Sequence, residues 1–196
     1  MNFARRIVIV SLAAALPFAA FAQDKSACAP KDGVVKVKLT TSMGPITLAL
    51  DAAKAPVTTA NFTKYVEAGF YSGTLFHRVI DNFMIQGGGF TKDMVQKPTM
   101  VPIKNEGANG LKNDNYTISM ARTGDPDSAT AQFFINVKDN DMLNAAAPRP
   151  GYAVFGKVTD GKETVDKIKK VATGNHPAGH QNVPTTPVVI EKAECI

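Results

Sequence analysis

The segment 76–89 constrains the fold most, because it reads as two short strands joined by a tight turn. Asp81 and Asn82 supply the turn, since their side chains bond nearby backbone groups and tolerate unusual dihedral angles. Alternation along a pleated strand sends every second side chain to one face, here Phe76, Arg78 and Ile80, and then Phe83, Ile85 and Gly87. An arginine beside an apolar Phe-Met pair and an amide suits a shallow apolar pocket with a strong hydrogen-bond donor at its rim.

Short runs of alternating or β-branched residues predict further strands along the chain. These runs cover residues 34–39, 46–50, 117–120, 133–136, 153–158 and 188–192. One helix is predicted to begin at Pro56, where a first helical residue tolerates proline, and to stop at Gly69. A second helix is predicted after Gly161. Many short strands with two separated helices predict a mostly β fold, a closed antiparallel barrel with helices over its ends.

Residues 1–22 have the layout of a secretory signal peptide. Arg5 and Arg6 form a positive start, an apolar run follows, and Ala20-Phe21-Ala22 is a small-residue cleavage site. The alternative is a membrane anchor, but spanning takes about 20 apolar residues, and Pro17 interrupts this run. We therefore expect export, cleavage after Ala22, and no membrane attachment of the mature chain.

The mature chain, residues 23–196, has the length of one domain with a sizeable core. Cleavage removes two arginines and no acidic residue, which leaves 20 basic against 17 acidic residues. This balance is ordinary, and no basic stripe with interleaved aromatics appears, so no nucleic-acid partner is expected. His176 and His180 are four residues apart, but proline and glycine between them argue against one helical face, and structural zinc usually has more ligands. No metal and no cofactor is predicted.

Segment 76–89 resembles the signature hairpin of the cyclophilins, the peptidyl-prolyl cis-trans isomerases. Residues 119–122 are similar to the strand whose end binds the substrate backbone in that family. Residues 128–136 are similar to the strand that supplies an amide and a pocket aromatic, and 152–156 to the next strand. The similarity spans about residues 34–190 and is nearest to the periplasmic bacterial cyclophilins, given the Gly87–Phe90 version of the loop. It implies an eight-stranded cyclophilin-like barrel with two helices capping its ends.

The resemblance also implies roles for particular residues. Arg78 would be catalytic, and Gln86 would orient it or bond the substrate carbonyl. The substrate-binding residues would be Phe83, Met84, Phe134 and Leu143 in the proline pocket, Gln132 and the main chain of Ala121 and Arg122 along the substrate backbone, and Met142 and Tyr152 at the rim. The alternatives are a surface ion pair for Arg78, the commoner use of an arginine, and plain core packing for the apolar residues.

Three residues depart from the family pattern. Met142 stands where many cyclophilins carry a tryptophan, Tyr152 where many carry a histidine, and Arg122 where asparagine is common. Residues 144–151 form a longer connection than in many relatives. These differences bear on ligand preference more than on catalysis, because the catalytic set is present.

Cys28 and Cys195 are the two cysteines of the chain. An even count in an exported protein indicates a disulfide, and cyclophilin-like folds place the first and last strands side by side. The alternative is two free, inert thiols. A bridge closing so long a loop stabilises a fold by up to about 5 kcal/mol in the chain-entropy model.

The sequence thus predicts a monomeric periplasmic isomerase that acts on proline-containing polypeptides and unfolded exported proteins. A rival hypothesis is a non-catalytic peptide-binding module or holdase chaperone on the same scaffold, and a third is a host-directed secreted factor. Arg78 favours the enzyme over the binder, because a pure binder has no need of that donor. Release beyond the periplasm stays open, as do the client proteins and the residue preferred before proline.

Overall fold

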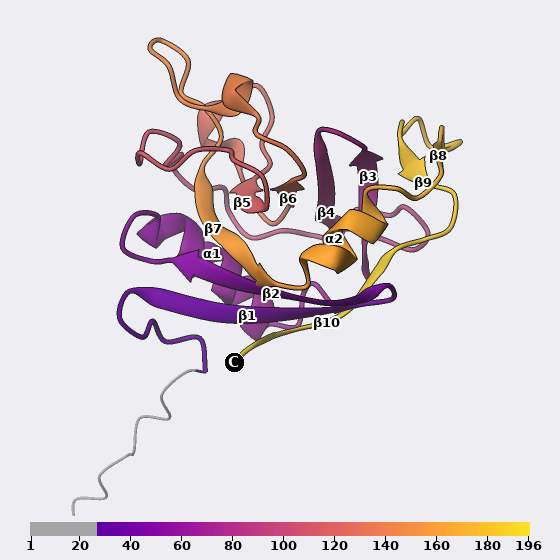
Figure 1. The fold of residues 1–196 in the computed structure, drawn as a ribbon, viewed down its shortest axis with the longest axis horizontal. Coiled ribbons are helices and arrows are strands. Elements are labelled where there is room, and N and C mark those ends of the chain that lie inside the picture. The colour runs from indigo at the N-terminus through magenta and orange to yellow at the C-terminus, as the bar shows by residue number, and fades with distance from the viewer. Residues whose placement is uncertain (1–26) are drawn as a thin grey trace, which may run out of the picture.

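The computed structural model describes residues 27–196, so the predicted signal segment 1–22 and the domain's first residues, 23–26, lie outside it. Eight strands close into a barrel in the order β1-β10-β3-β4-β6-β5-β7-β2, and every neighbouring pair is antiparallel (Figure 1). The strands are β1 (Val34–Thr41), β2 (Gly44–Asp51), β3 (Thr74–Ile80), β4 (Met84–Thr91), β5 (Thr117–Met120), β6 (Phe133–Asn136), β7 (Val154–Asp160) and β10 (Val189–Cys195). The predicted mostly β closed barrel is confirmed.

Two helices complete the barrel, α1 (Pro56–Glu67) and α2 (Lys162–Ile168). Both contribute to the core that the strands enclose: Phe62 and Tyr65 of α1 and Val165 of α2 are fully buried there. Proline opens α1 as predicted. The first turn of α1 lacks a local side-chain cap and is held by Glu106 from a distant loop, whose carboxylate accepts from the N–H groups of Val57 and Thr58.

The sequence did not predict the smaller elements. A two-stranded sheet joins β8 (Thr173–Gly174) to β9 (Val183–Pro184), and short 3₁₀ turns occur at η1 (Pro126–Ser128) and η2 (Asp141–Leu143). These elements lie in connections between barrel strands and carry no periodic pattern long enough to read. The turn η2 carries Met142 and Leu143, two of the predicted site residues.

The β3–β4 hairpin corrects one sequence prediction. The turn falls at residues 81–83, where Asn82 has the positive φ of 57° that asparagine tolerates. The register shifts between Phe76 and Arg78, which inserts an extra residue into β3. Phe76 and Val79 therefore both join the core, whereas Arg78 lies on the opposite, outer face. The expectation that Phe76 and Arg78 share a face was wrong, because simple alternation cannot foresee a bulge.

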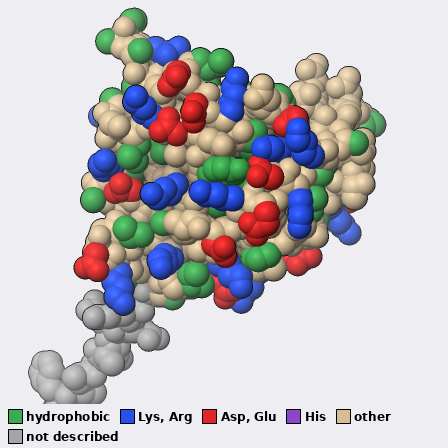
Figure 2. All heavy atoms as spheres, in the orientation of Figure 1, with side chains coloured by type: hydrophobic (Ala, Val, Ile, Leu, Met, Phe, Trp, Pro, Cys, Tyr) green, Lys and Arg blue, Asp and Glu red, His purple; other side chains and the backbone are tan. Residues whose placement is uncertain are grey.

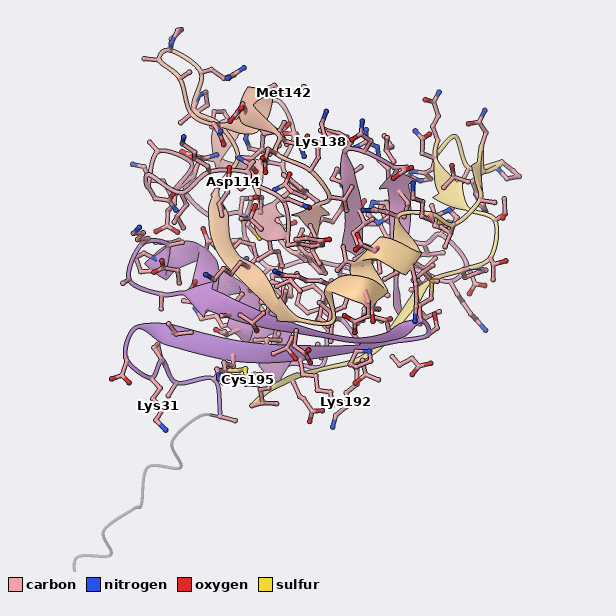
Figure 3. All side chains as sticks on the ribbon, in the orientation of Figure 1. Lys31, Asp114, Lys138, Met142, Lys192 and Cys195 are labelled. Carbon is pink, nitrogen blue, oxygen red and sulfur yellow. A yellow bond between two sulfur atoms is a disulfide. The ribbon has the colours of Figure 1, made fainter. Side chains whose placement is uncertain are left out.

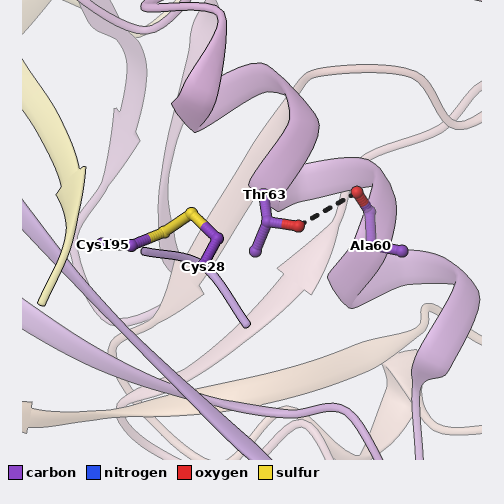
Figure 4. The surroundings of a disulfide bond; sticks show 4 residues. All are labelled: Cys28, Ala60, Thr63 and Cys195. Carbon is purple, nitrogen blue, oxygen red and sulfur yellow. Dashed lines mark hydrogen bonds between the residues drawn. A yellow bond between two sulfur atoms is a disulfide. The ribbon is translucent and has the colours of Figure 1, made fainter. Parts of the chain in front are cut away.

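A disulfide joins Cys28 to Cys195 with 5.1 Å between their Cα atoms. Figure 4 shows it beside Thr63 of α1, whose hydroxyl donates to the Ala60 carbonyl. The bridge fastens the segment before β1 to the last residue of β10, its neighbour in the barrel. The predicted pairing is present in the structure.

Charged side chains of both signs are interspersed over the face shown in Figure 2, without a large patch of one sign. Three ion pairs, all involving lysines, occur within residues 27–196. No helix in this described part of the chain is long and apolar enough to cross a bilayer.

Candidate active site

One row of the barrel's outer face gathers three of the predicted site residues. Arg78 of β3 lies directly opposite Gln86 of β4, and Gln86 lies directly opposite Phe134 of β6. Directly paired residues of antiparallel strands share a face. The neighbouring row pairs Ile80 with Met84 on that same face, and the alternate residues between these rows point into the core. The site is therefore built on the wall of the barrel, outside the core.

Hydrogen bonds fix the guanidinium of Arg78 on this wall. Its Nη1 donates to Gln86 Oε1 at 3.3 Å and lies 4.0 Å from the sulfur of Met84. The amide of Gln86 is itself oriented, because its Nε2 donates to Gln132 Oε1 at 2.9 Å. No carboxylate among residues 27–196 forms an ion pair with Arg78. The positive charge thus stays uncompensated, and the remaining N–H groups of its fork are free of protein partners in this part of the chain.

Glycines in β4 let Gln132 approach. A Cβ at Gly89 would lie 2.6 Å from Gln132 Cγ, and one at Gly88 would lie 2.8 Å from the rings of Phe133 and Tyr71. Gly88 also has a φ of +79°, which glycine adopts without strain. The sequence was interpreted as a glycine loop here, but the glycines belong to strand β4. Their lack of a side chain leaves room for Gln132 beside the site and for the rings of Phe133 and Tyr71 in the core.

Three side chains stack along one edge of this face. The rings of Phe134 and Tyr152 meet edge to face, with centroids 5.6 Å apart. The guanidinium of Arg122 lies over the Tyr152 ring at 4.4 Å, which is cation–π geometry. Phe134 is 4% exposed, and Tyr152 is half-buried. The stack therefore runs from a nearly buried ring at Phe134 to a charged group at Arg122.

A buried asparagine network connects the loops around the site. Asn140 Nδ2 donates to the Phe83 carbonyl at 2.7 Å and to Asn136 Oδ1 at 2.8 Å. The Asn140 carbonyl accepts from the N–H of Leu143 at 2.9 Å. One side chain and its backbone thus link the β3–β4 turn, which carries Phe83, to the η2 turn, which carries Leu143.

The other predicted residues take up three kinds of position. Met84 is 2% exposed and contacts Arg78 through its sulfur, so it packs under the site and offers almost no surface to a ligand. Met142 is 61% exposed, as a rim residue would be. The N–H of Ala121 donates to the Gln132 carbonyl, so its own carbonyl is the main-chain group left for a ligand. The N–H of Tyr152 donates to the Leu143 carbonyl at 2.9 Å, which joins both ends of the 144–151 connection.

His77 is packed away from this face. It is 5% exposed, and its ring centroid lies 4.6 Å from that of Phe90. Burial, reinforced by the charges of His180 and Arg78, lowers its pKa to about 4, so the imidazole is neutral at neutral pH. The N–H of His176 donates to the His180 carbonyl, and no group of three metal-ligating side chains occurs in residues 27–196.

Comparison with known proteins decides the family. The family "Cyclophilin type peptidyl-prolyl cis-trans isomerase/CLD" matches residues 36–195, nearly all of the described chain. This chain belongs to the cyclophilins.

Its similarity to bacterial enzymes is high. It is 61% identical over 163 residues to peptidyl-prolyl cis-trans isomerase cyp18 of Streptomyces antibioticus, covering 82% of this chain and 98% of that one. It is 59% identical over 160 residues to isomerase A of Dickeya dadantii, covering 82% and 84%. A crystal structure of a Cryptosporidium parvum cyclophilin superposes with a TM-score of 0.68 at 25% identity, covering 83% of this chain and 98% of that one. The cyclophilin described here is therefore a peptidyl-prolyl cis-trans isomerase.

The geometry brings most of the predicted residues of this cyclophilin together. Arg78, Gln86 and Gln132 form one hydrogen-bonded chain, and Phe134, Tyr152 and Arg122 form one stack. Sequence reasoning missed Asn140, because a lone asparagine before a turn looks like ordinary turn chemistry. The pattern Asn-x-x-x-Asn at 136 and 140 was the available signal, since asparagine at the end of a buried strand needs a partner.

Proposed function

We propose that this cyclophilin isomerises X-Pro bonds with Arg78 as the catalytic group. Rotation about the amide bond faces a barrier of about 18–20 kcal/mol, because resonance gives the bond partial double-bond character. A hydrogen-bond donor aimed at the proline nitrogen favours its pyramidal form and so weakens that resonance in the twisted state. A fixed guanidinium that stays charged suits this task.

The way Arg78 is held carries this proposal. A neutral amide, Gln86, anchors the guanidinium, where a carboxylate would neutralise its charge. The side-chain hydrogen bonds of Arg78 within residues 27–196 use Nη1, to Gln86 and Met84, and leave Nε and Nη2 for a ligand. A donor that is oriented, charged and unoccupied costs little reorganisation when the substrate twists. The absence of Arg78 from the ion pairs of residues 27–196 supports this role over a surface ion pair.

The proline ring would pack on Phe134, with Phe83 and Leu143 on either side and Met84 below. Support comes from the row Arg78-Gln86-Phe134, which puts the apolar ring on the same face as the guanidinium. Gln86 would orient Arg78, and Gln132 with the carbonyl of Ala121 would bind the substrate backbone. Met142, Tyr152 and the main chain of Arg122 would form the rim.

We further infer that the protein works in the periplasm as a monomer on unfolded exported chains. The signal-like segment 1–22 supports export, and the Cys28–Cys195 disulfide fits an oxidising compartment. X-Pro isomerisation limits folding for tens to hundreds of seconds, so exported chains rich in proline benefit from an isomerase there.

The test is an NMR exchange assay on an Ala-Pro peptide. Arg78→Ala is expected to lower kcat/KM at least tenfold, equal to about 1.4 kcal/mol of transition-state stabilisation. Arg78→Lys is expected to restore activity only in part, because a point charge replaces the planar fork. Arg149→Ala is the matched control, since within residues 27–196 the side chain of this exposed arginine donates only to the Asn144 carbonyl. Near-normal turnover in Arg78→Ala would refute the mechanism, and peptide binding without turnover in the unaltered protein would favour the holdase.

A further inference from the structure

The guanidinium of Arg122 is held rigidly at the edge of the site. Its Nε and Nη2 donate to the Gly151 carbonyl at 3.4 and 3.1 Å, and its Nη1 donates to the Thr123 carbonyl at 2.9 Å. The Tyr152 ring packs against its flat side. These bonds use three of the five N–H groups that an arginine offers. Two N–H groups therefore remain for a ligand, on a side chain whose position is already fixed.

The charge of Arg122 is also uncompensated. None of the ion pairs in residues 27–196 includes it. The carboxylates that follow it along the chain are turned to backbone groups: Asp125 accepts from the N–H of Asp127, and Asp127 accepts from the N–H of Asn105. Its own protein partners are neutral carbonyls. Arg122 thus presents a positive charge with no internal counter-charge, as Arg78 does on the other side of Phe134.

The distance from the Arg122 guanidinium to Phe134 matches the spacing between a proline and a nearby side chain of the same bound peptide. The guanidinium carbon lies 4.4 Å from the Tyr152 ring centre, which lies 5.6 Å from the Phe134 ring centre. An extended peptide advances about 3.5 Å per residue. A glutamate or aspartate one or two positions from a proline on Phe134 therefore reaches Arg122.

We propose that Arg122 is a specificity-determining residue that favours proline peptides carrying an acidic side chain within two residues of the proline. The inference rests on the proposed role of Phe134 as the proline platform. A planar guanidinium with two free N–H groups donates to a carboxylate with defined geometry. Complementary charge at a rim acts mainly on encounter and orientation, so the preference is expected to weaken with salt.

The experiment compares peptides that differ at one position. Gly-Gly-Ala-Pro-Gly-Gly peptides carrying glutamate, glutamine or lysine at each position within two residues of the proline are assayed by NMR exchange. The assays are run in low salt and in about 0.5 M NaCl, where the Debye length falls to about 4 Å. At one position or more, the kcat/KM ratio of glutamate to glutamine is expected to reach three or above in low salt. The ratio is expected to approach one in high salt.

Variants assign the preference to Arg122. Arg122→Met keeps an apolar stem over Tyr152 but no charge, and it is expected to bring the glutamate-to-glutamine ratio to about one. Arg122→Lys is expected to keep part of the preference. Arg149→Met, which removes a nearby exposed arginine, is expected to leave the ratio unchanged. A ratio of one in the unaltered protein at every position, or a ratio that persists in Arg122→Met, would overturn this inference. The Arg78→Ala assay decides the proposed mechanism separately, because it uses an uncharged peptide.

Discussion

Asn140 offers a direct test of how the site is held together. Truncation to alanine removes both hydrogen bonds of its Nδ2, to the Phe83 carbonyl and to Asn136 Oδ1. The Phe83 carbonyl keeps a second donor, the N–H of Val137 at 3.1 Å. Asn136 is fully buried, and its Oδ1 keeps no other partner within residues 27–196. The two acceptors are therefore affected unequally.

The expected change in stability follows from these contacts. An orphaned buried acceptor costs about 1–3 kcal/mol, and a lost neutral hydrogen bond costs about 0.5–1.5 kcal/mol. Asn140 Oδ1 is itself buried without a partner, so truncation also removes one existing penalty of about 1–3 kcal/mol. With the small cavity that remains, we expect Asn140→Ala to lower the free energy of unfolding by about 1–2 kcal/mol. Urea unfolding measures this loss as a shift of the midpoint at an unchanged m-value.

The same substitution is expected to lower kcat/KM at least threefold, because the carbonyl of Phe83 loses its hydrogen bond to the residue before the η2 turn. The N–H of Leu143 keeps its bond to the Asn140 carbonyl, so only the link between the two turns is broken. Leu39→Ala is the control: Leu39 is fully buried in β1, which lies across the closed barrel from β6. It is expected to cost about 2–5 kcal/mol of stability and to leave kcat/KM unchanged below the unfolding temperature. If Asn140→Ala reduces activity no more than Leu39→Ala does, Asn140 serves folding alone. A stability loss below about 0.5 kcal/mol would refute the hydrogen-bond argument.

Two further predictions concern stability. The folded-state pKa of His77, lowered by burial to about 4, lies below the unfolded value of about 6.5, so the unfolded chain takes up the proton first. The contribution of neutral His77 to the free energy of unfolding is complete above pH 6.5. It is lost as the pH drops toward 4, which lowers the free energy of unfolding by about 3 kcal/mol in total. Urea titrations across this range should show that fall, and His77→Phe should flatten it; an equal slope in both proteins would contradict the assignment. Peptide mapping of the exported protein should find Gln23 at its start and Cys28 linked to Cys195. Reduction should lower the melting temperature but leave turnover intact, because Met142 at the proposed rim and Cys195 lie at opposite ends of the molecule (Figure 3). Free thiols in the native sample would contradict the disulfide, and loss of activity on reduction would contradict its independence from the site.

Local pattern was enough to place most of the barrel. The strands over 117–120 and 133–136 were predicted with their observed bounds, because alternation and β-branched residues are local signals. The hairpin turn at Asp81-Asn82 was also foreseen. The bulge before Arg78 was not, since it depends on how closely Gly87 approaches the backbone of Leu75, where a Cβ would lie 2.9 Å from the carbonyl.

In the site, too, short motifs identified the residues but not the contacts between residues far apart in the sequence. The row Arg78-Gln86-Phe134 could be named from motifs, but its hydrogen bonds could not. Gln132 reaches Gln86 across 46 residues of sequence, and Asn140 reaches Phe83 across 57. Such contacts follow from strand register and loop packing, which a single sequence does not encode in any short window. The stack of Arg122 on Tyr152 is a third case, since each residue could be noted as a departure from the family pattern but nothing in the sequence indicated their contact.

The disulfide has a consequence for the connectivity of the domain. It brings residue 28 beside residue 195, and the N–H of Ile196 donates to the Lys36 carbonyl at 3.0 Å, so the two ends of the described chain share one place on the barrel. A few linking residues between them would make the backbone a ring. New ends could then be opened in an exposed connection without altering the order of strands around the barrel. A partner protein fused at either end would likewise stand away from the proposed site.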